Sequence, residues 1–165
     1  MRLYLCEKPS QASDIARVLG AARRGEGLIE GNDFVVTWAF GHLLEQAPPE
    51  AYGEQYGSPW SIEVLPVIPE EWQMVVKDKI ARQFNVIRRL LCKADEVVIA
   101  TDADREGEII ARELLDYCGY TGVVRRLWLS ALDESSIREA LGRILPGEKT
   151  ARLYEAGKGR SRADW

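Results

Sequence analysis

The sequence predicts an α/β fold in which helices cover both faces of a mostly parallel sheet. Segments with the helical spacing of apolar residues alternate along the chain with short β-branched runs, which is the pattern of strand–helix–strand units. Runs such as "VVIA" are continuously apolar, as in a strand that is buried on both faces. The 165 residues are enough for one domain with a hydrophobic core.

The first half of the chain is expected to open with a strand, a loop and a helix. Pro9 is tolerated in the first turn of that helix, and Gly20 ends its apolar spacing. Prolines and glycines are concentrated in "QAPPEAYGEQYGSPW", which predicts a long surface loop. In order, the expected segments are a strand at 2–6, a helix within 8–20, a glycine-rich turn at 21–32, a strand at 33–40, the loop at 46–60 and an edge strand within 61–72.

The second half is more regular. Apolar residues recur at helical spacing in three segments, and two β-branched runs separate these segments. The last stretch, at 148–165, has a helical pattern that Gly157 and Gly159 are expected to interrupt. Before it, the expected segments are a helix at 81–94, a strand at 95–101, a helix at 106–119, a strand at 123–129 and a helix at 133–144.

Composition and charge exclude several classes of protein. The chain is 46% hydrophobic and 29% charged, as in soluble globular domains, and its net charge of -4 gives no overall basic signature for nucleic acid. No apolar run approaches the length of a membrane span, and the apolar run at the N-terminus is too short for a signal peptide. The three cysteines form no C-x-x-C, so no zinc site or disulfide framework is indicated. We therefore expect a cytoplasmic protein that does not contact a membrane.

Four carboxylates, Asp102, Asp104, Glu106 and Glu108, lie at and just beyond the end of the strand expected at 95–101. Like charges about 4 Å apart repel by about 4 kcal/mol at an effective dielectric of about 20. Solvent, a helix N-terminus or a metal ion would each offset that repulsion. Helix capping accounts for one or two of the carboxylates, but the cluster exceeds what capping requires.

Two kinds of metal site fit the cluster. Asp102, Asp104, Glu106, Gly107 and Glu113 nearly match a calcium loop, but such a loop follows a helix, and here the β-branched "EVVIAT" precedes it. A magnesium site fits better, because parallel strands bind ligands beyond their carboxyl ends, where Asp102 and Asp104 lie. A site of this kind handles phosphate esters or anhydrides.

Glu7 and Lys8 follow the first expected strand directly. If that strand neighbours the strand at 95–101, Glu7 faces the acidic cluster across the carboxyl edge of the sheet. A carboxyl group near magnesium can transfer protons, and a lysine can hold a phosphate as a point charge. Taken alone, the Glu–Lys pair is more typical of a solvated loop, so its meaning depends on the strand order.

Together these stretches resemble the Toprim signature, a glutamate after the first strand and D-x-D-x-E after a later one. The resemblance extends over nearly the whole chain to DNA topoisomerase III, a family of type IA enzymes. Five segments carry it: "LYLCEKPSQASDIARVLG", "VTWAFGHLLEQAPPEAYG", "ATDADREGEIIARELL", "RRLWLSALDESSIREAL" and "GRSRADW". It implies a Rossmann-like Toprim fold and an ATP-independent isomerase that cleaves, passes and rejoins single DNA strands.

The resemblance also implies residue roles. Glu7 would protonate the departing 3′ oxygen and act as the base when the break is resealed, and Lys8 would contact the scissile phosphate. Asp102, Asp104 and Glu106, with Glu7 close by, would hold Mg²⁺. Contacts to single-stranded or underwound DNA are implied for Lys8, His42, Arg160, Arg162 and Asp164.

Two of these DNA-contact assignments have simpler structural interpretations that do not involve DNA. From the residues alone, His42 in "FGHLLEQ" fits a hydrogen-bonded loop histidine equally well. The basic residues near the C-terminus fit a solvated helix face.

The resemblance further implies a domain division. Residues 1–150 would form the Toprim domain, and residues 151–165 would begin a DNA-groove domain that is cut short. The family's nucleophilic tyrosine lies downstream, and none of the six tyrosines of this chain stands in its motif. The chain is thus expected to be an incomplete and by itself inactive part of a bacterial enzyme associated with the nucleoid or a plasmid. Its partners would be DNA and the remaining topoisomerase domains.

Two other functions stay open at this point. A free-standing Toprim nuclease or primase-like protein would need its own nucleophile or activated water, and the topoisomerase-like segments around His42 and Trp128 disfavour it. A metal-binding regulatory domain would bind calcium tightly, without any effect of DNA.

Overall fold

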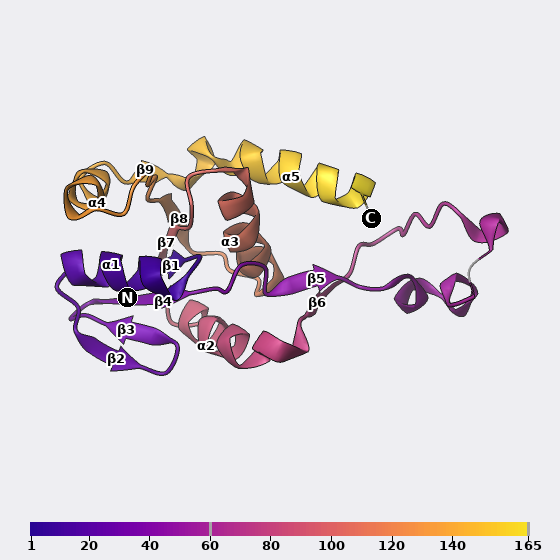
Figure 1. Ribbon diagram of the computed structural model, residues 1–165, viewed down its shortest axis with the longest axis horizontal. Helices are drawn as coiled ribbons and strands as arrows, with labels where there is room; N and C mark the ends of the chain where they lie inside the picture. Colours follow the sequence, from indigo (N-terminus) through magenta and orange to yellow (C-terminus); the bar gives the residue numbers. More distant parts are fainter. Residues whose placement is uncertain (60, 165) are drawn as a thin grey trace.

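The computed structural model describes residues 1–59 and 61–164, and within them a seven-stranded sheet forms the centre of the molecule (Figure 1). The strand order is β2-β3-β4-β1-β7-β8-β9. The strands are β1 (Arg2–Cys6), β2 (Arg23–Gly25), β3 (Leu28–Glu30), β4 (Phe34–Trp38), β7 (Glu96–Ala100), β8 (Val123–Arg126) and β9 (Leu145–Pro146). A separate pair joins β5 (Leu44–Gln46) to β6 (Met74–Val76) in antiparallel fashion.

The middle of the large sheet is parallel. Strand β1 pairs in parallel with both β4 and β7, and β7 pairs in parallel with β8. Antiparallel pairs occur only toward the two edges, at β2–β3, β3–β4 and β8–β9. The register places Cys6 opposite Trp38 on one side and Ala100 on the other, so the carboxyl ends of three strands are aligned. The expected mostly parallel α/β sheet is confirmed.

Helices pack on both faces of the sheet because successive strand residues point to opposite sides. Leu3 and Leu5 of β1 belong to the core under α2 and α3, whereas Tyr4 and Cys6 belong to the core under α1 and α4. Each of these helices carries its own apolar stripe, which produces two cores separated by the sheet. The helices are α1 (Pro9–Val18), α2 (Ala81–Leu91), α3 (Arg105–Tyr117), α4 (Glu134–Leu141) and α5 (Ala151–Asp164).

Three sequence expectations about elements are wrong. The turn at 21–32 is instead the β2–β3 hairpin, which turns at Gly27 with a φ of 72°. The strand expected within 61–72 is absent from the described part of that range, and the chain instead forms β6 just beyond it, opposite β5. Pro66 and Pro69 explain this shift, because proline cannot donate to a strand ladder.

The third difference is the unbroken helix α5, which runs through Gly157 and Gly159. A side chain at position 157 would place its Cβ 2.2 Å from Ile109 Cδ1 of α3. Gly157 therefore permits α5 to lie close against α3, rather than ending the helix. Tyr154 of α5 is buried at the same contact and donates a hydrogen bond to Asp116 (2.7 Å). Trp165, the last residue of the expected helix, lies outside the described residues.

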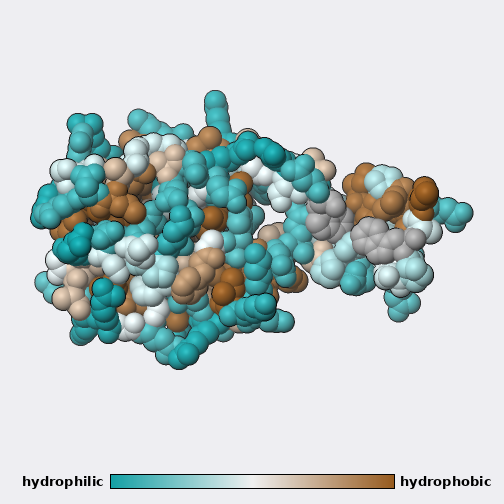
Figure 2. All heavy atoms as spheres, in the orientation of Figure 1, coloured by the Kyte–Doolittle hydropathy of each residue, from teal (hydrophilic) through white to brown (hydrophobic). Residues whose placement is uncertain are grey.

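Residues 47–59 and 61–73, here called the arm, extend away from the rest of the molecule beyond β5 and β6 (Figure 1). The arm contains short 3₁₀ turns but no strand or α-helix among its described residues. Its surface is partly apolar (Figure 2), and Ile62, Leu65 and Ile68 are its exposed large aliphatic residues. No described helix combines the length and the hydropathy that a membrane crossing requires.

Candidate functional site

The candidate site lies at the carboxyl ends of β1 and β7. These strands are neighbours. The prediction that Glu7 and Lys8 lie beside the acidic cluster required this strand order. Glu7 directly follows β1, and Asp102 comes two residues after β7. Ligands bind at this edge in parallel α/β sheets, because the loops between strands and helices gather there.

Glu7 and Asp102 converge on the ammonium group of Lys8. Lys8 Nζ lies 3.1 Å from Asp102 Oδ2 and 3.4 Å from Glu7 Oε1. The hydrogen bond to Asp102, followed by the charge of Glu7, raises the pKa of Lys8. The backbone N–H of Asp102 also donates to Glu7 Oε2 at 3.4 Å. Two carboxylates that are distant in sequence therefore already share one cation, and Lys8 is exposed enough to reach an incoming phosphate.

Gln11 links these two loops and was not singled out from the sequence. Its side chain is buried, and its amide nitrogen donates to Asp102 Oδ1 at 3.0 Å. Its amide oxygen accepts from the backbone N–H of Glu7 at 2.8 Å. Gln11 thus fixes the relative position of Glu7 and Asp102. The sequence did contain a signal for this role, because Gln11 is a polar residue on the apolar face of the helix that follows Glu7.

Asp104 caps helix α3. Its Oδ1 accepts from the backbone N–H of Gly107 at 2.7 Å, as expected of an N-cap aspartate. The helix begins at Arg105, so Asp104 lies just before the first turn and Glu106 within it. The plain capping interpretation therefore holds for Asp104, and it leaves Asp102 and Glu106 to be explained by other partners.

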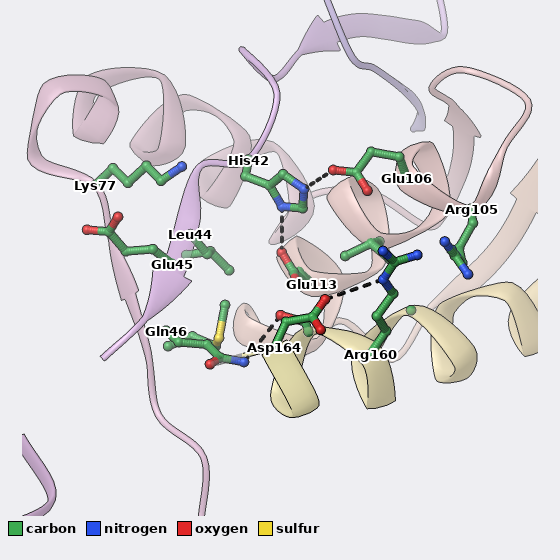
Figure 3. A pocket seen from close by; sticks show the side chains of 14 residues that line it. His42, Leu44, Glu45, Gln46, Lys77, Arg105, Glu106, Glu113, Arg160 and Asp164 are labelled. Atoms are coloured by element: carbon green, nitrogen blue, oxygen red, sulfur yellow. Dashed lines mark hydrogen bonds and ion pairs between the residues drawn. The ribbon is translucent and has the colours of Figure 1, made fainter. Parts of the chain in front are cut away.

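Glu106 pairs with His42 on the other side of α3 (Figure 3). His42 Nε2 lies 2.7 Å from Glu106 Oε1, and Nδ1 lies 3.1 Å from Glu113 Oε2. Carboxylates only accept hydrogen bonds, so both ring nitrogens donate only when the imidazole is protonated. The hydrogen bond to Glu113 is the main cause that raises the pKa of His42, and the bond to Glu106 adds to it. The role of Glu113 as a partner of His42 was not predicted.

The four carboxylates expected to hold a metal therefore do not share one partner: Glu7 and Asp102 meet at Lys8, whereas Asp104 caps α3 and Glu106 pairs with His42. No three His, Cys, Asp or Glu side chains in residues 1–59 and 61–164 are grouped closely enough to hold a metal ion. The donor chemistry nevertheless fits magnesium, because all four groups offer carboxylate oxygens. Glu7 and Asp102 already converge on a cation, and the Glu106 side chain is 62% exposed and hence free to turn.

Two of the three predicted DNA-contact residues of α5, Arg160 and Asp164, line a groove rather than the Glu7–Asp102 cluster. The groove has a volume of about 560 Å³ and lies between α3, α5 and the β5–β6 pair. Arg160 and Asp164 are paired at 3.3 Å in it, and His42 lies on the opposite wall (Figure 3). Arg162 lies outside this groove and stacks over the Trp72 ring at 5.5 Å. His42 thus connects the groove to the acidic cluster through Glu106.

A buried ion pair beneath the acidic cluster was also missed. Arg126, the last residue of β8, and Glu108 of α3 are both fully buried, with Arg126 Nε 2.6 Å from Glu108 Oε1. Burial lowers the pKa of Arg126, and the charge of Glu108 opposes that effect. The signal in the sequence was the dipeptide Arg125–Arg126 within a strand, since one of two successive residues must face inward.

Comparisons with known proteins show the family to which the chain belongs. The family model described as "Toprim domain" matches residues 2–132. The chain is similar to proteins named DNA topoisomerase 3, with 44% identity to that of Shouchella clausii, 42% to that of Staphylococcus epidermidis and 41% to that of Bacillus subtilis. Each of these matches covers 99% of this chain but only 23% of the relative.

A solved structure has the same fold. The full-length topoisomerase I of Thermotoga maritima superposes with a TM-score of 0.56 and 21% identity, over 87% of this chain and 21% of that protein.

Proposed function

The chain belongs to the Toprim domain family, and from that premise we propose that it is the magnesium-binding, proton-transferring part of a bacterial type IA DNA topoisomerase III. The observation that carries the proposal is the convergence of Glu7 and Asp102 on Lys8 at the joined ends of β1 and β7. The chain spans about a quarter of the length of the curated relatives it matches. Cleaving, passing and rejoining DNA strands is therefore proposed for the longer protein, with the nucleophilic tyrosine outside these residues.

Each residue of the cluster has a proposed role. Glu7 transfers a proton to the departing 3′ oxygen of the cleaved strand and takes it back when the strand is rejoined. Lys8 places a positive charge on the scissile phosphate. Asp102, Asp104 and Glu106 would hold Mg²⁺, with Glu7 close by, and when bound the ion would neutralise charge on the reacting phosphate.

DNA is the proposed partner, and the groove beside α5 is the proposed path of a single strand. Basic side chains that track phosphates are typical of sites that bind single-stranded nucleic acid. Arg160 lines the groove and is paired with Asp164, and Arg162 follows on the same helix, over the Trp72 ring. We also propose that 1–150 and 151–165 belong to different domains of the longer protein, with α5 beginning the second domain.

A magnesium titration tests the proposed metal site. We expect calorimetry to detect Mg²⁺ binding by the chain, and the Asp102→Asn/Asp104→Asn variant to weaken it at least about tenfold. The control is Glu134→Gln/Glu139→Gln, which makes the same change in charge on exposed α4 side chains. Equal affinities in the two variants would contradict the assignment. If the wild type binds no Mg²⁺, the titration is repeated with a single-stranded oligonucleotide, and a second failure would also contradict it.

A further inference from the structure

We propose that Arg126 is a positioning residue that fixes the backbone of residues 101–104, here called the acidic loop, so that its carboxylates are oriented before any cation binds. Glu108 holds Arg126 in place. The inference rests on the proposed function, because it explains how a magnesium loop is pre-organised. It assigns a task to two buried charges that lie behind the site and would touch neither metal nor DNA.

The guanidinium of Arg126 binds backbone carbonyls in the first half of the acidic loop and in the strand before it. Nη1 donates to the carbonyl of Thr101 at 2.8 Å and to that of Ile99 at 3.2 Å, and Nη2 donates to the carbonyl of Asp102 at 2.5 Å. Nη1 also lies 3.0 Å from the carbonyl of Leu127. One planar group thereby contacts carbonyls in β7, in the loop and just after β8. Lysine cannot match this set from a single ammonium group.

The carbonyl of Asp102 is the point at which the loop meets helix α3. It accepts from Arg126 and also from the backbone N–H of Asp104 at 2.9 Å. The backbone N–H of Gly107 in turn donates to the Asp104 side chain. A Cβ at position 107 would lie only 2.2 Å from the Asp102 carbonyl oxygen, so the helix end is packed directly on it. Moving this carbonyl would therefore move both aspartates and the cap of α3.

A purely structural role does not account for a fully buried charge at this position. Replacing a buried ion pair by apolar residues is often neutral or stabilising, because desolvating two charges is costly. Nε of Arg126 and Oε1 of Glu108 are 2.6 Å apart, yet neither atom has a hydrogen bond of good geometry among the described residues. The contact is thus an ion pair that keeps Arg126 charged. The hydrogen bonds of the guanidinium all go to backbone carbonyls around the loop.

Glu108 is tied to the far edge of the sheet as well. Its Oε2 accepts from Arg112 Nε at 2.6 Å, and Arg112 also donates to the carbonyl of Gly147 at 2.6 Å. The positive charge of Arg126 lies beneath a loop that carries Asp102 and Asp104. It offsets part of the repulsion between these carboxylates.

The test compares two ion pairs of the same strand. Arg126→Met/Glu108→Gln removes the buried pair and leaves the net charge unchanged. Arg125→Met/Glu96→Gln makes the same substitutions in a pair 2.9 Å apart, between the neighbouring residue of β8 and the first residue of β7. Glu96 lies at the start of β7, away from the acidic loop at its end, and its other ion-pair partner is Arg2. Arg126→Lys is the milder variant, which keeps the charge and loses most of the backbone hydrogen bonds.

The readout is amide hydrogen exchange at Asp104 and Gly107, with Leu5 and Val98 as reporters of the folded core. We expect exchange at Asp104 and Gly107 to be at least about tenfold faster in Arg126→Met/Glu108→Gln, with core amides unchanged and with the control variant like the wild type. Wild-type protection of both loop amides in the folded variant would overturn the proposal. If that variant does not fold, Arg126→Lys decides by the same comparison.

A magnesium titration of the same variants tests whether Arg126 orients the carboxylates for the ion or only makes the acidic loop more rigid. We expect Mg²⁺ affinity to fall about 10–100-fold in Arg126→Met/Glu108→Gln and to be kept in the control. Faster exchange with unchanged affinity would overturn the assignment of a positioning role. A wild type that binds no Mg²⁺, with or without DNA, would count against the proposed function, and hydrogen exchange would still decide whether Arg126 orders the loop.

Discussion

At the scale of single residues, the carboxylates of the site differ in what holds them. Asp102 is bound by Lys8 and Gln11, Asp104 by a backbone N–H of α3, and Glu106 by His42. Lys8, Gln11 and the backbone N–H of Gly107 donate hydrogen bonds to these carboxylates, and His42 does so when its Nε2 carries a proton. This explains how several acidic residues can lie together at the end of a buried strand.

Asp133 offers a residue-level test of how hydrogen bonds act on a carboxylate. It caps α4, and its oxygens accept from Ser135 Oγ, from Ser136 Oγ and from the backbone N–H of Ser136. These bonds hold the pKa of Asp133 well below its ordinary value of 3.8. A carboxyl group whose pKa is lowered by folding stabilises the fold above its unfolded pKa, and that contribution is lost as the pH falls toward the folded pKa.

We therefore expect Asp133→Ala to lower the melting temperature at about pH 6 and to have a smaller effect at about pH 2. Thermal unfolding of the wild type and the variant, followed by circular dichroism at both pH values, measures the difference between their melting temperatures. A difference that is the same at both pH values would contradict the role given to the ionised cap.

At the scale of elements, two helical glycines differ in whether the surrounding structure leaves room for a side chain. Gly107 lies in the first turn of α3, where a Cβ would meet the Asp102 carbonyl oxygen at 2.2 Å. Gly159 lies in α5, where a Cβ would have no neighbour within 4 Å. Alanine normally stabilises a helix relative to glycine by about 1 kcal/mol. Only unfavourable local packing can therefore make a Gly→Ala variant less stable than the wild type.

We expect Gly107→Ala to destabilise the fold by about 1–3 kcal/mol, as overpacked sites do. Gly159→Ala, the matched control, should stabilise it by up to about 1 kcal/mol. Urea unfolding of the two variants and the wild type gives both free energies. Stabilisation by Gly107→Ala would mean that the loop moves away from α3 at little cost.

At the scale of the whole molecule, the arm is separate from the hydrophobic cores. None of the described residues between positions 48 and 82 is buried, whereas strands from both sides of the arm pair in one sheet. The pairing of β1 with β4 and with β7 therefore does not depend on the arm. Exposed segments with few buried contacts open at low free energy, and proteases cut them first.

We expect a glutamate-specific protease to cut first within the arm, at one of Glu50, Glu54, Glu63, Glu70 or Glu71. Glu134 and Glu139 are the internal control, because they are exposed but lie in helix α4. The two pieces should stay together in gel filtration, since both contribute strands to the same sheet. Separation of the pieces, or earlier cleavage in α4, would contradict this description.

The sequence by itself determined most of the local structure. Apolar periodicity located four parallel strands and the helices on both faces, because short-range spacing governs which face of an element is buried. The ends of β1 and β7 were marked by Glu7 and by the acidic residues from Asp102 onward. The resemblance to the Toprim family was readable as well, and the match over residues 2–132 confirms it.

Only the tertiary structure decided which of these residues meet. The order of the strands brings Glu7 to Asp102, and the packing of α3 brings Glu106 to His42 and Glu108 to Arg126. The same packing explains why α5 continues through Gly157. Local periodicity carries no information about partners that are many residues apart, because those contacts depend on how whole elements pack. The positions of the charged groups were therefore set by the sequence, and their partners by the fold.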